Sequence, residues 1–395
     1  MGDLKKVLLL NAGHTEMPMI DELRKMGCYI ISSGNRPDFP GHALCDEYVR
    51  ADYSNVDEVF EIVKDKCVDG IVSCAHDYGL VTASHIAEHM GWKGHDTVEN
   101  TLLLHEKDRF KELCKKMGIR SPLSTCFMDL DEALLFAKNT EYPIIVKAAD
   151  QASGVGINKA QDYNEAVSAI NDAFNKSRKK KIVVEPYIEG QQESFVAFVV
   201  NKRVVSCMTC NCYSPINPYL IQTETMPSDN FDSLKKELIE ITETLFDTLD
   251  LVDGIITLQY IVSNGKPYII ETMRRCLGNQ FLLPVEKVTG FPWHKALVMS
   301  ELGMDCSELR AALPEAKYAG HHAIMVTKNG KYLSTCVPDE IMDHVFKYVE
   351  LFKTGQQVKN YLNERIGYIY YKFENRQIMD SFARTFNQNI QVNME

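Results

Sequence analysis

The sequence predicts a multidomain protein in which an α/β region is followed by α+β regions. Its 395 residues are too many for one hydrophobic core, since domains usually run to roughly 100–200 residues. Over the first hundred residues, short apolar runs alternate with helical patterns, which is typical of a doubly wound parallel sheet. Later strands follow one another across short turns, which is typical of antiparallel pairing.

The N-terminal region begins with a continuous apolar run at residues 5–10, which predicts a buried parallel strand. The first strand–helix turn reads Asn11-Ala12-Gly13. It lacks the glycines of the GxGxxG fingerprint, so NAD binding is a weak alternative here. The same patterns predict further strands at 28–31, 48–49 and 70–73, with helices at 19–26, at 56–66 and from 77 onwards.

A lysine followed by a small-residue loop marks the next region. Helices are expected at 107–117 and 129–139, and residues 142–147 predict a strand that ends on Lys147. Ala-Ala-Asp-Gln-Ala-Ser-Gly-Val-Gly follows at 148–156. Glycines in such a loop let backbone N–H groups approach a phosphate, and the lysine adds positive charge. The loop is not a Walker motif, and an ordinary turn is the alternative.

Antiparallel strands are expected after this loop. A helix at 163–174 precedes a strand at 182–188, strands at 194–200 and 204–208, and a long amphipathic helix at 231–249. Five basic side chains lie between 176 and 181. They predict a solvated loop, with nucleic-acid binding as a poor second interpretation.

Residues 255–271 predict a β-hairpin, because two apolar runs flank Asn264-Gly265, the strongest short-range hairpin signal. The second run ends in Glu271, and Arg274 and Arg275 follow it. Buried charges need partners, and a polyanion carrying a divalent cation would satisfy both signs. The alternative is an ordinary hairpin with a surface ion pair.

The C-terminal part predicts a smaller α+β cap from residue 311 onwards. A helix is expected to start at 287–292 and to run to 302. Strands are expected at 319–327 and 366–373, around a helical segment at 346–351.

Composition excludes several classes. The formal net charge of −11 argues against general nucleic-acid binding, and no apolar run approaches the roughly 20 residues of a membrane helix. With no signal-peptide layout, the 12 cysteines are expected to be reduced thiols in a cytoplasmic protein. Cys207, Cys210 and Cys212 form one cluster, for which a buried strand is favoured over a zinc site, because no second ligand pair stands nearby in sequence.

One combination is far more specific than its parts. Lys147 and its loop precede Val-Val-Glu-Pro-Tyr-Ile-Glu-Gly at 183–190, and Gln259, Glu271 and Arg275 follow later. This combination resembles the ATP-grasp superfamily over roughly residues 100–300. It is most similar to the large chain of carbamoyl-phosphate synthase, where a glutamine also occupies the first metal position. Lys-Val-Thr-Gly-Phe-Pro at 287–292 resembles a run found there as well.

The resemblance implies a role for each matching position, with ATP and Mg²⁺ as cofactors. The implied catalytic residues are Lys147, Glu271 and Arg275, the last of which steadies an acyl phosphate. Lys107 and Lys147 hold phosphates, Ser153, Gly154 and Gly156 form the covering loop, Glu185, Tyr187 and Ile188 read adenine, Glu193 takes the ribose hydroxyls, and Gln259 and Glu271 bind magnesium.

One position departs from the family pattern. Met273 stands where the family has asparagine, and a thioether cannot replace a hard oxygen ligand of magnesium. Glu271 is then the only clear carboxylate of the metal cluster, which puts a second metal ion in doubt.

The implied function is that of an ATP-dependent carboxylate–amine ligase acting through an acyl phosphate. The alternative is a catalytically degraded ATP-binding sensor or scaffold. Substrates are expected to be a small carboxylate and an amine, held near His14, His76, Arg274, Asn279 and the 211–225 loop, and a homodimer is possible. The expected domains are an N-terminal Rossmann-like domain at 1–100, ATP-grasp lobes at 101–187 (small) and 188–310 (large), and the cap at 311–395.

Overall fold

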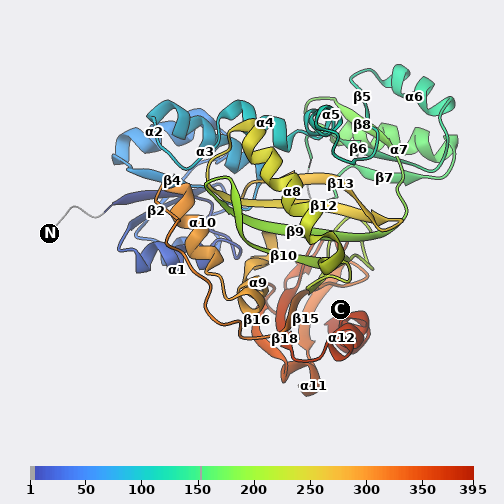
Figure 1. The fold of residues 1–395 in the computed structure, drawn as a ribbon. Coiled ribbons are helices and arrows are strands. Elements are labelled where there is room, and N and C mark those ends of the chain that lie inside the picture. The colour runs from blue at the N-terminus through green and yellow to red at the C-terminus, as the bar shows by residue number, and fades with distance from the viewer. Residues whose placement is uncertain (1–4, 152–153) are drawn as a thin grey trace.

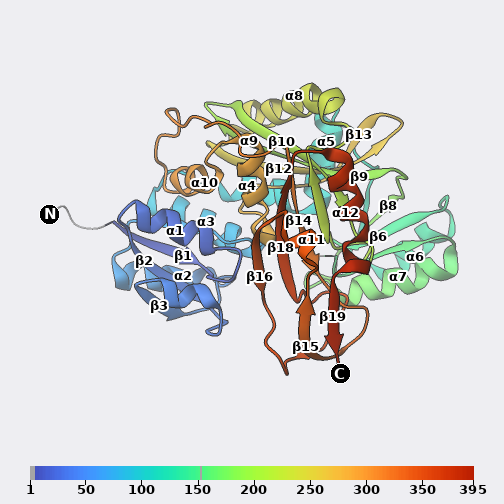
Figure 2. The ribbon, with the colours of Figure 1, turned by 90° about the horizontal axis from the view of Figure 1, so that it is seen from below.

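The computed structural model describes residues 5–151 and 154–395 (Figures 1 and 2). Its N-terminal sheet is parallel, with strand order β3-β2-β1-β4, so the predicted parallel sheet is confirmed. Apolar side chains of α1 pack on one face of this sheet, and those of α2 and α3 pack on the other. The elements are β1 (Lys6–Leu10), α1 (Met17–Lys25), β2 (Tyr29–Gly34), η1 (Pro40–Leu44), β3 (Glu47–Arg50), α2 (Val56–Lys66), β4 (Gly70–Val72) and α3 (Asp77–Met90).

Two helices, α4 (Val98–His105) and α5 (Lys107–Met117), lead into a second lobe. This lobe is a four-stranded antiparallel sheet of order β5-β8-β6-β7. Helices α6 and α7 bury their apolar side chains against it. Its elements are β5 (Thr125–Phe127), α6 (Leu130–Lys138), β6 (Ile144–Ala148), β7 (Ile157–Ala160), α7 (Tyr163–Lys176) and β8 (Ile182–Pro186).

An eight-stranded sheet lies between the N-terminal sheet and the β5–β8 lobe (Figures 1 and 2). Its order is β13-β12-β9-β10-β11-β14-β18-β16. Helix α8 packs on one face, and α9 and α10 pack on the other. The elements are β9 (Gln191–Val200), β10 (Arg203–Tyr213), β11 (Thr223–Met226), α8 (Phe231–Leu249), β12 (Gly254–Ser263), β13 (Lys266–Met273), η2 (Gly278–Gln280), α9 (Leu282–Thr289), α10 (Trp293–Glu301), β14 (Tyr318–Ile324), β16 (Val345–Glu350) and β18 (Gly367–Phe373).

The predicted Asn-Gly hairpin is confirmed, because β12 and β13 pair antiparallel around Asn264 and Gly265. Both turn residues have positive φ, 51° and 69°, as a tight hairpin turn requires.

The C-terminal strands β14, β18 and β16 extend the large sheet rather than forming a sheet of their own. A small sheet of β15 (Gly330–Cys336), β17 (Gln357–Val358) and β19 (Gln391–Met394) stands beside them, with α11 (Asp339–Met342) and α12 (Arg376–Asn389). The domain boundaries given above remain predictions. Within the described residues, no helix is long and apolar enough to cross a bilayer.

Two predicted helices were wrong. Residues 346–351 fall mostly in strand β16, where β-branched and aromatic side chains pair with β18. The helix expected to run from 287–292 to 302 is two helices, because α9 ends at Gly290 and α10 begins after Pro292. Gly290 has φ +67°, and a Cβ there would lie 2.1 Å from the Ala312 carbonyl oxygen, so only glycine fits this break.

Candidate functional site

A cleft of about 1780 Å³ is lined by strand residues of the β5–β8 sheet and of the eight-stranded sheet, and by residues that follow the strands of the N-terminal sheet. Lys147 of β6 and Glu271 of β13 both line it, although they belong to different sheets. The sequence-predicted residues that the structure brings together in this cleft are Lys107, Lys147, Gly154, Glu185, Tyr187, Ile188, Gln259, Glu271 and Arg275.

Gln259 and Glu271 are direct partners across the β12–β13 ladder. Directly opposed residues of an antiparallel pair point to the same face, so an amide oxygen and a carboxylate lie side by side on the cleft floor. The Nζ atom of Lys107 lies 3.7 Å from Oε2 of Glu271 and donates a hydrogen bond to the Gln151 carbonyl oxygen at 2.8 Å. This arrangement offers hard oxygen donors with a cation beside them.

Glu185 lines the cleft and lies between two lysines. Its Oε2 accepts a hydrogen bond from Lys147 Nζ at 2.6 Å, and its Oε1 lies 3.5 Å from Lys111 Nζ. Burial would raise the pKa of Glu185, but Lys147 and Lys111 outweigh it and lower that pKa below its ordinary value. Burial lowers the pKa of Lys111 to about 8, against the pull of Glu185.

Lys111 was missed by the sequence reasoning. The signal available was its position four residues after Lys107 in one helix, which places both lysines on the same helix face. Only the fold shows that this face meets Glu185.

Arg275 forms an ion pair with Asp77, a residue of the N-terminal α/β region. Its Nε donates to Oδ1 of Asp77 at 2.5 Å, and Asp77 begins helix α3. Burial would raise the pKa of Asp77, but Arg275 and His105 hold it well below its ordinary value. The guanidinium is thus fixed at the cleft wall by an ionised carboxylate.

The small-residue loop lies against the segment between β10 and β11. Ser153 lies outside the described residues, and Gly156 does not line the cleft, whereas Gly154 does. Gly154 has φ +75°, and a Cβ there would lie 2.7 Å from the Tyr219 carbonyl oxygen. A glycine is therefore required at this position as the loop stands.

The structure does not bring Glu193 into the cleft. Its side chain is fully buried and accepts hydrogen bonds from Ser228, Asn230 and Tyr260. The reason is strand alternation, because its neighbour Ser194 lines the cleft and successive side chains point to opposite faces. Gln192, on the other side of Glu193, lines the cleft as well.

Arg274 is also turned away from the cleft. Its Nε donates to Oδ2 of Asp96 at 2.8 Å, and its two terminal nitrogens donate to the carbonyl oxygens of Ile255 and Val252. Arg274 therefore ties the hairpin to the chain before α4, and the expected substrate contact is not formed.

The cleft also contains other expected substrate neighbours. His14, His76 and Asn279 line it, together with residues 218–221 and Glu224 of the expected 211–225 loop. Much of that expected loop is strand, because β10 continues to Tyr213 and β11 begins at Thr223. Burial, with a smaller contribution from Lys347, lowers the pKa of His14 to about 4.

Met273 lies in the cleft wall and is largely buried. Its sulfur lies 3.5 Å from a terminal nitrogen of Arg275. The side chain at this position therefore contacts the arginine and offers no oxygen ligand.

The family model of the phosphoribosylglycinamide synthetase ATP-grasp (A) domain matches residues 105–217. This part of the chain therefore matches an ATP-grasp domain. The chain is 23% identical, over 323 residues, to the carbamoyl phosphate synthase large chain of Clostridium beijerinckii. That alignment covers 77% of this chain but 30% of the relative, so the chain spans less than a third of the relative's length.

Solved structures share the fold over the whole chain. Phosphoribosylglycinamide synthetase from Anaerococcus prevotii superposes with a TM-score of 0.77 and 22% identity, covering 100% of both chains. L-amino acid ligase from Bacillus licheniformis superposes with a TM-score of 0.82 and 16% identity, covering 99% of both. The predicted ATP-grasp fold with its preceding parallel sheet is confirmed.

Proposed function

We propose that this protein is an ATP-dependent ligase that joins a carboxylate to an amine and releases ADP and phosphate. One observation carries the proposal. Lys107 of α5, Lys147 of β6 and Arg275, two residues after β13, line the same cleft as Glu271 and Gln259. Three cations beside a carboxylate and an amide suit a triphosphate with its divalent cation.

Magnesium fits the donor set at the β12–β13 edge. Glu271 and Gln259 supply hard oxygen atoms on paired strands, and magnesium is usually held by one or two protein oxygens together with substrate phosphates. When bound there, it would neutralise charge on the phosphates. Met273 adds no oxygen ligand, so we expect one protein-held magnesium position rather than two.

The reaction needs alignment and charge neutralisation more than covalent help. A substrate carboxylate oxygen bonds to the terminal phosphorus of ATP as the bond to the ADP oxygen breaks. The amine nitrogen then attacks the acyl carbon, the bond from that carbon to the phosphate oxygen breaks, and the amine loses a proton. Lys107 and Lys147 bind phosphate oxygens, and Arg275 stabilises the charge on the transferred group.

The loop around Gly154 would exclude water from the cleft. An acyl phosphate is hydrolysed by water, so the cleft must exclude water during transfer. The close approach of Gly154 to Tyr219 supports such a covering role for this loop.

The test is a screen of amino-acid pairs for ADP and phosphate release with ATP and magnesium. At least one carboxylate–amine pair should stimulate release well above either component alone. Glu271→Ala should abolish the stimulated release, whereas Glu308→Ala, at an exposed carboxylate, should leave it unchanged. Near-normal turnover in Glu271→Ala would remove Glu271 from the mechanism.

Met273 supports a second candidate, a catalytically degraded ATP-binding sensor or scaffold. This candidate predicts ATP–magnesium binding with no stimulation of ADP release by any substrate pair. An NAD-dependent reductase is a third and weaker candidate. Thermal stabilisation by ATP–magnesium and none by NADH would exclude it.

We expect the protein to act in the cytoplasm, with small molecules as substrates and neither nucleic acid nor membrane as a partner, and a homodimer is one possible assembly. Light scattering on the purified chain tests the dimer.

A further inference from the structure

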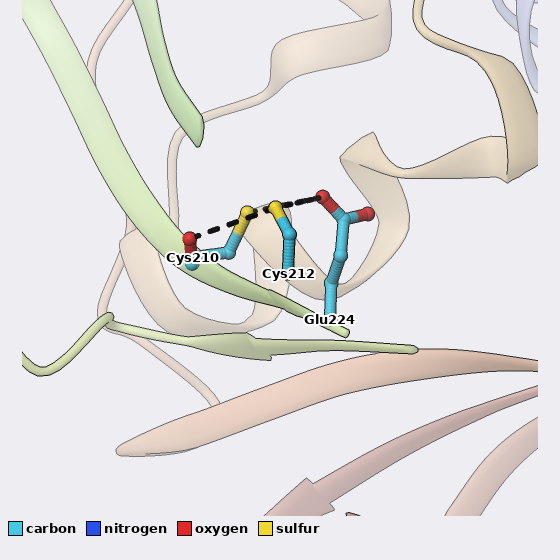
Figure 3. A group of neighbouring side chains, drawn as sticks. All are labelled: Cys210, Cys212 and Glu224. Atoms are coloured by element: carbon cyan, nitrogen blue, oxygen red, sulfur yellow. Dashed lines mark hydrogen bonds between the residues drawn. The ribbon is translucent and has the colours of Figure 1, made fainter. Parts of the chain in front are cut away.

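Two thiols and a carboxylate meet in the eight-stranded sheet, and none of them is among the residues proposed to bind ATP or magnesium. They are Cys210 and Cys212 of β10 and Glu224 of β11, and their Sγ and carboxylate oxygen atoms all lie within 4.8 Å of one another (Figure 3). Cys210 is 0% exposed, and Cys212 and Glu224 are 5% exposed. The sequence alone offered no third ligand for these cysteines, and the fold supplies one.

Strand pairing explains how this trio forms. Cys212 lies directly opposite Glu224 in the β10–β11 ladder, and residues two apart in a strand share a face. Cys210 and Cys212 therefore both point to Glu224. Cys207, an odd number of residues away, packs with the side chains of α8 on the other face.

His321 provides a second and independent observation. It lies opposite Glu224 in the β11–β14 ladder, with its Nδ1 3.3 Å from Oε2 of Glu224. The ring is 0% exposed, and neither ring nitrogen makes a hydrogen bond to any residue that the structure describes. Buried polar atoms are normally paired, and a side chain of this kind beside a carboxylate is typical of the outer shell of a metal site.

We propose that Cys210, Cys212 and Glu224 bind one zinc-class divalent cation at the edge of the cleft, where Glu224 lines the cleft and the two cysteines are buried beside it, with a further position open to the cleft. Thiolates and a carboxylate are ordinary zinc ligands, and the donor atoms around one tetrahedral zinc lie about 3.5–3.8 Å apart. The two sulfur atoms lie 3.1 and 3.6 Å from Oε1 of Glu224, and all the donor atoms lie within 4.8 Å of one another. Three protein ligands with a fourth position open is the arrangement of a site that contacts substrate.

Glu224 lines the cleft, as does Ser194, whose Oγ lies 3.3 Å from Cys212 Sγ. A cation can therefore reach the trio from solvent through the cleft. The site is separate from the magnesium position. Cys210 pairs with Ser194 and Ser194 pairs with Gln259, so two strand spacings, about 10 Å, separate Cys210 from Gln259.

Without a cation, the trio is held by hydrogen bonds. Cys210 Sγ donates to Oε1 of Glu224 at 3.1 Å, and Cys212 Sγ lies 3.6 Å from the same oxygen. Binding replaces these contacts with metal–ligand bonds, and each thiol releases its proton to solvent. No electron is transferred.

The experiment uses the full chain, treated with chelator and assayed without ATP, so that its outcome is independent of the ligase proposal. Zinc titration should show one cation per chain, and cobalt(II) should give thiolate-to-metal charge-transfer absorption. Cys210→Ser and Cys212→Ser should each weaken zinc binding by about 100-fold or more, in line with the loss of a ligand. Cys207→Ser, on the same strand and the opposite face, should bind as the unaltered chain does.

Two results would overturn the proposal. One is no stoichiometric binding of zinc or cobalt by the unaltered chain, a measurement that needs no variant to fold. The other is equal affinity in Cys210→Ser and Cys207→Ser, with circular dichroism showing both folded.

Discussion

Two groups of donor atoms lie on one face of the eight-stranded sheet but carry different chemistry. At the β12–β13 edge, Gln259 and Glu271 offer hard oxygen atoms, with Lys107 close to the carboxylate. At the β10–β11 end, Cys210 and Glu224 offer soft sulfur beside oxygen. Ser194 of β9 lies between the two groups, since it pairs with Cys210 of β10 on one side and with Gln259 of β12 on the other.

The comparison shows how one sheet separates two sets of donor atoms. Strand spacing fixes the distance between the two groups, and side-chain alternation decides which residues face the cleft. Donor chemistry then decides what each group can bind, because hard oxygen favours magnesium and thiolate favours zinc.

Lys147→Met should weaken ATP turnover at the proposed magnesium–ATP site. The change removes a cation expected to bind phosphate and one partner of Glu185, so kcat/KM for ATP should fall about 100-fold or more. Steady-state release of ADP measures it. Lys138→Met, at an exposed lysine of the same lobe, is the control, and an equal loss in both variants would contradict a specific role for Lys147.

Lys111→Met should destabilise the protein by about 2 kcal/mol, because it leaves the buried Glu185 with one cation instead of two. Urea unfolding followed by circular dichroism measures the change. Lys115→Met, at an exposed position of the same helix, should have little effect. If the two variants unfold at the same urea concentration, Lys111 is not needed to balance Glu185.

His14, which lines the cleft, should make the stability of the protein depend on pH. Burial holds its pKa at about 4, below the 6.5 of the unfolded chain, so the unfolded chain binds more protons between those values. Its contribution to stability should therefore fall as pH drops from 6.5 towards 4, by about 1–2 kcal/mol between roughly pH 7 and pH 5.

The measurement is the difference in pH dependence of unfolding between the unaltered chain and His14→Gln, which should be less sensitive to acid. His89→Gln, at an exposed histidine, should keep the original dependence. A His14→Gln curve parallel to that of the unaltered chain would show that His14 titrates normally.

Met273→Asn should add a hard oxygen ligand beside Glu271 and Gln259. We expect the half-saturating magnesium concentration for ATP turnover to fall about threefold, because an amide oxygen can join Glu271 and Gln259. Met273→Leu keeps an apolar side chain of similar size and should leave the magnesium dependence unchanged. Equal magnesium curves for both variants would place position 273 outside the metal cluster.

Local patterns predicted most of the architecture. The apolar runs of the N-terminal sheet and the Asn-Gly turn of the hairpin gave the right elements, because strand type and turn conformation depend on neighbouring residues. Errors came where packing overrode local pattern. Residues 346–351 pair with β18 as a strand, and the break at Gly290 depends on the approach of Ala312, which is distant in sequence.

The sequence by itself supplied candidates for binding a magnesium–triphosphate, because Lys147, Gln259, Glu271 and Arg275 resemble the motif of one family. The tertiary structure decided which residues face the cleft. It turned Glu193 and Arg274 into buried contacts, set Lys111 beside Glu185, and brought Glu224 and His321 to the two cysteines of β10. These outcomes depend on strand register and on which face of each strand is covered, and both are fixed only when distant segments pair.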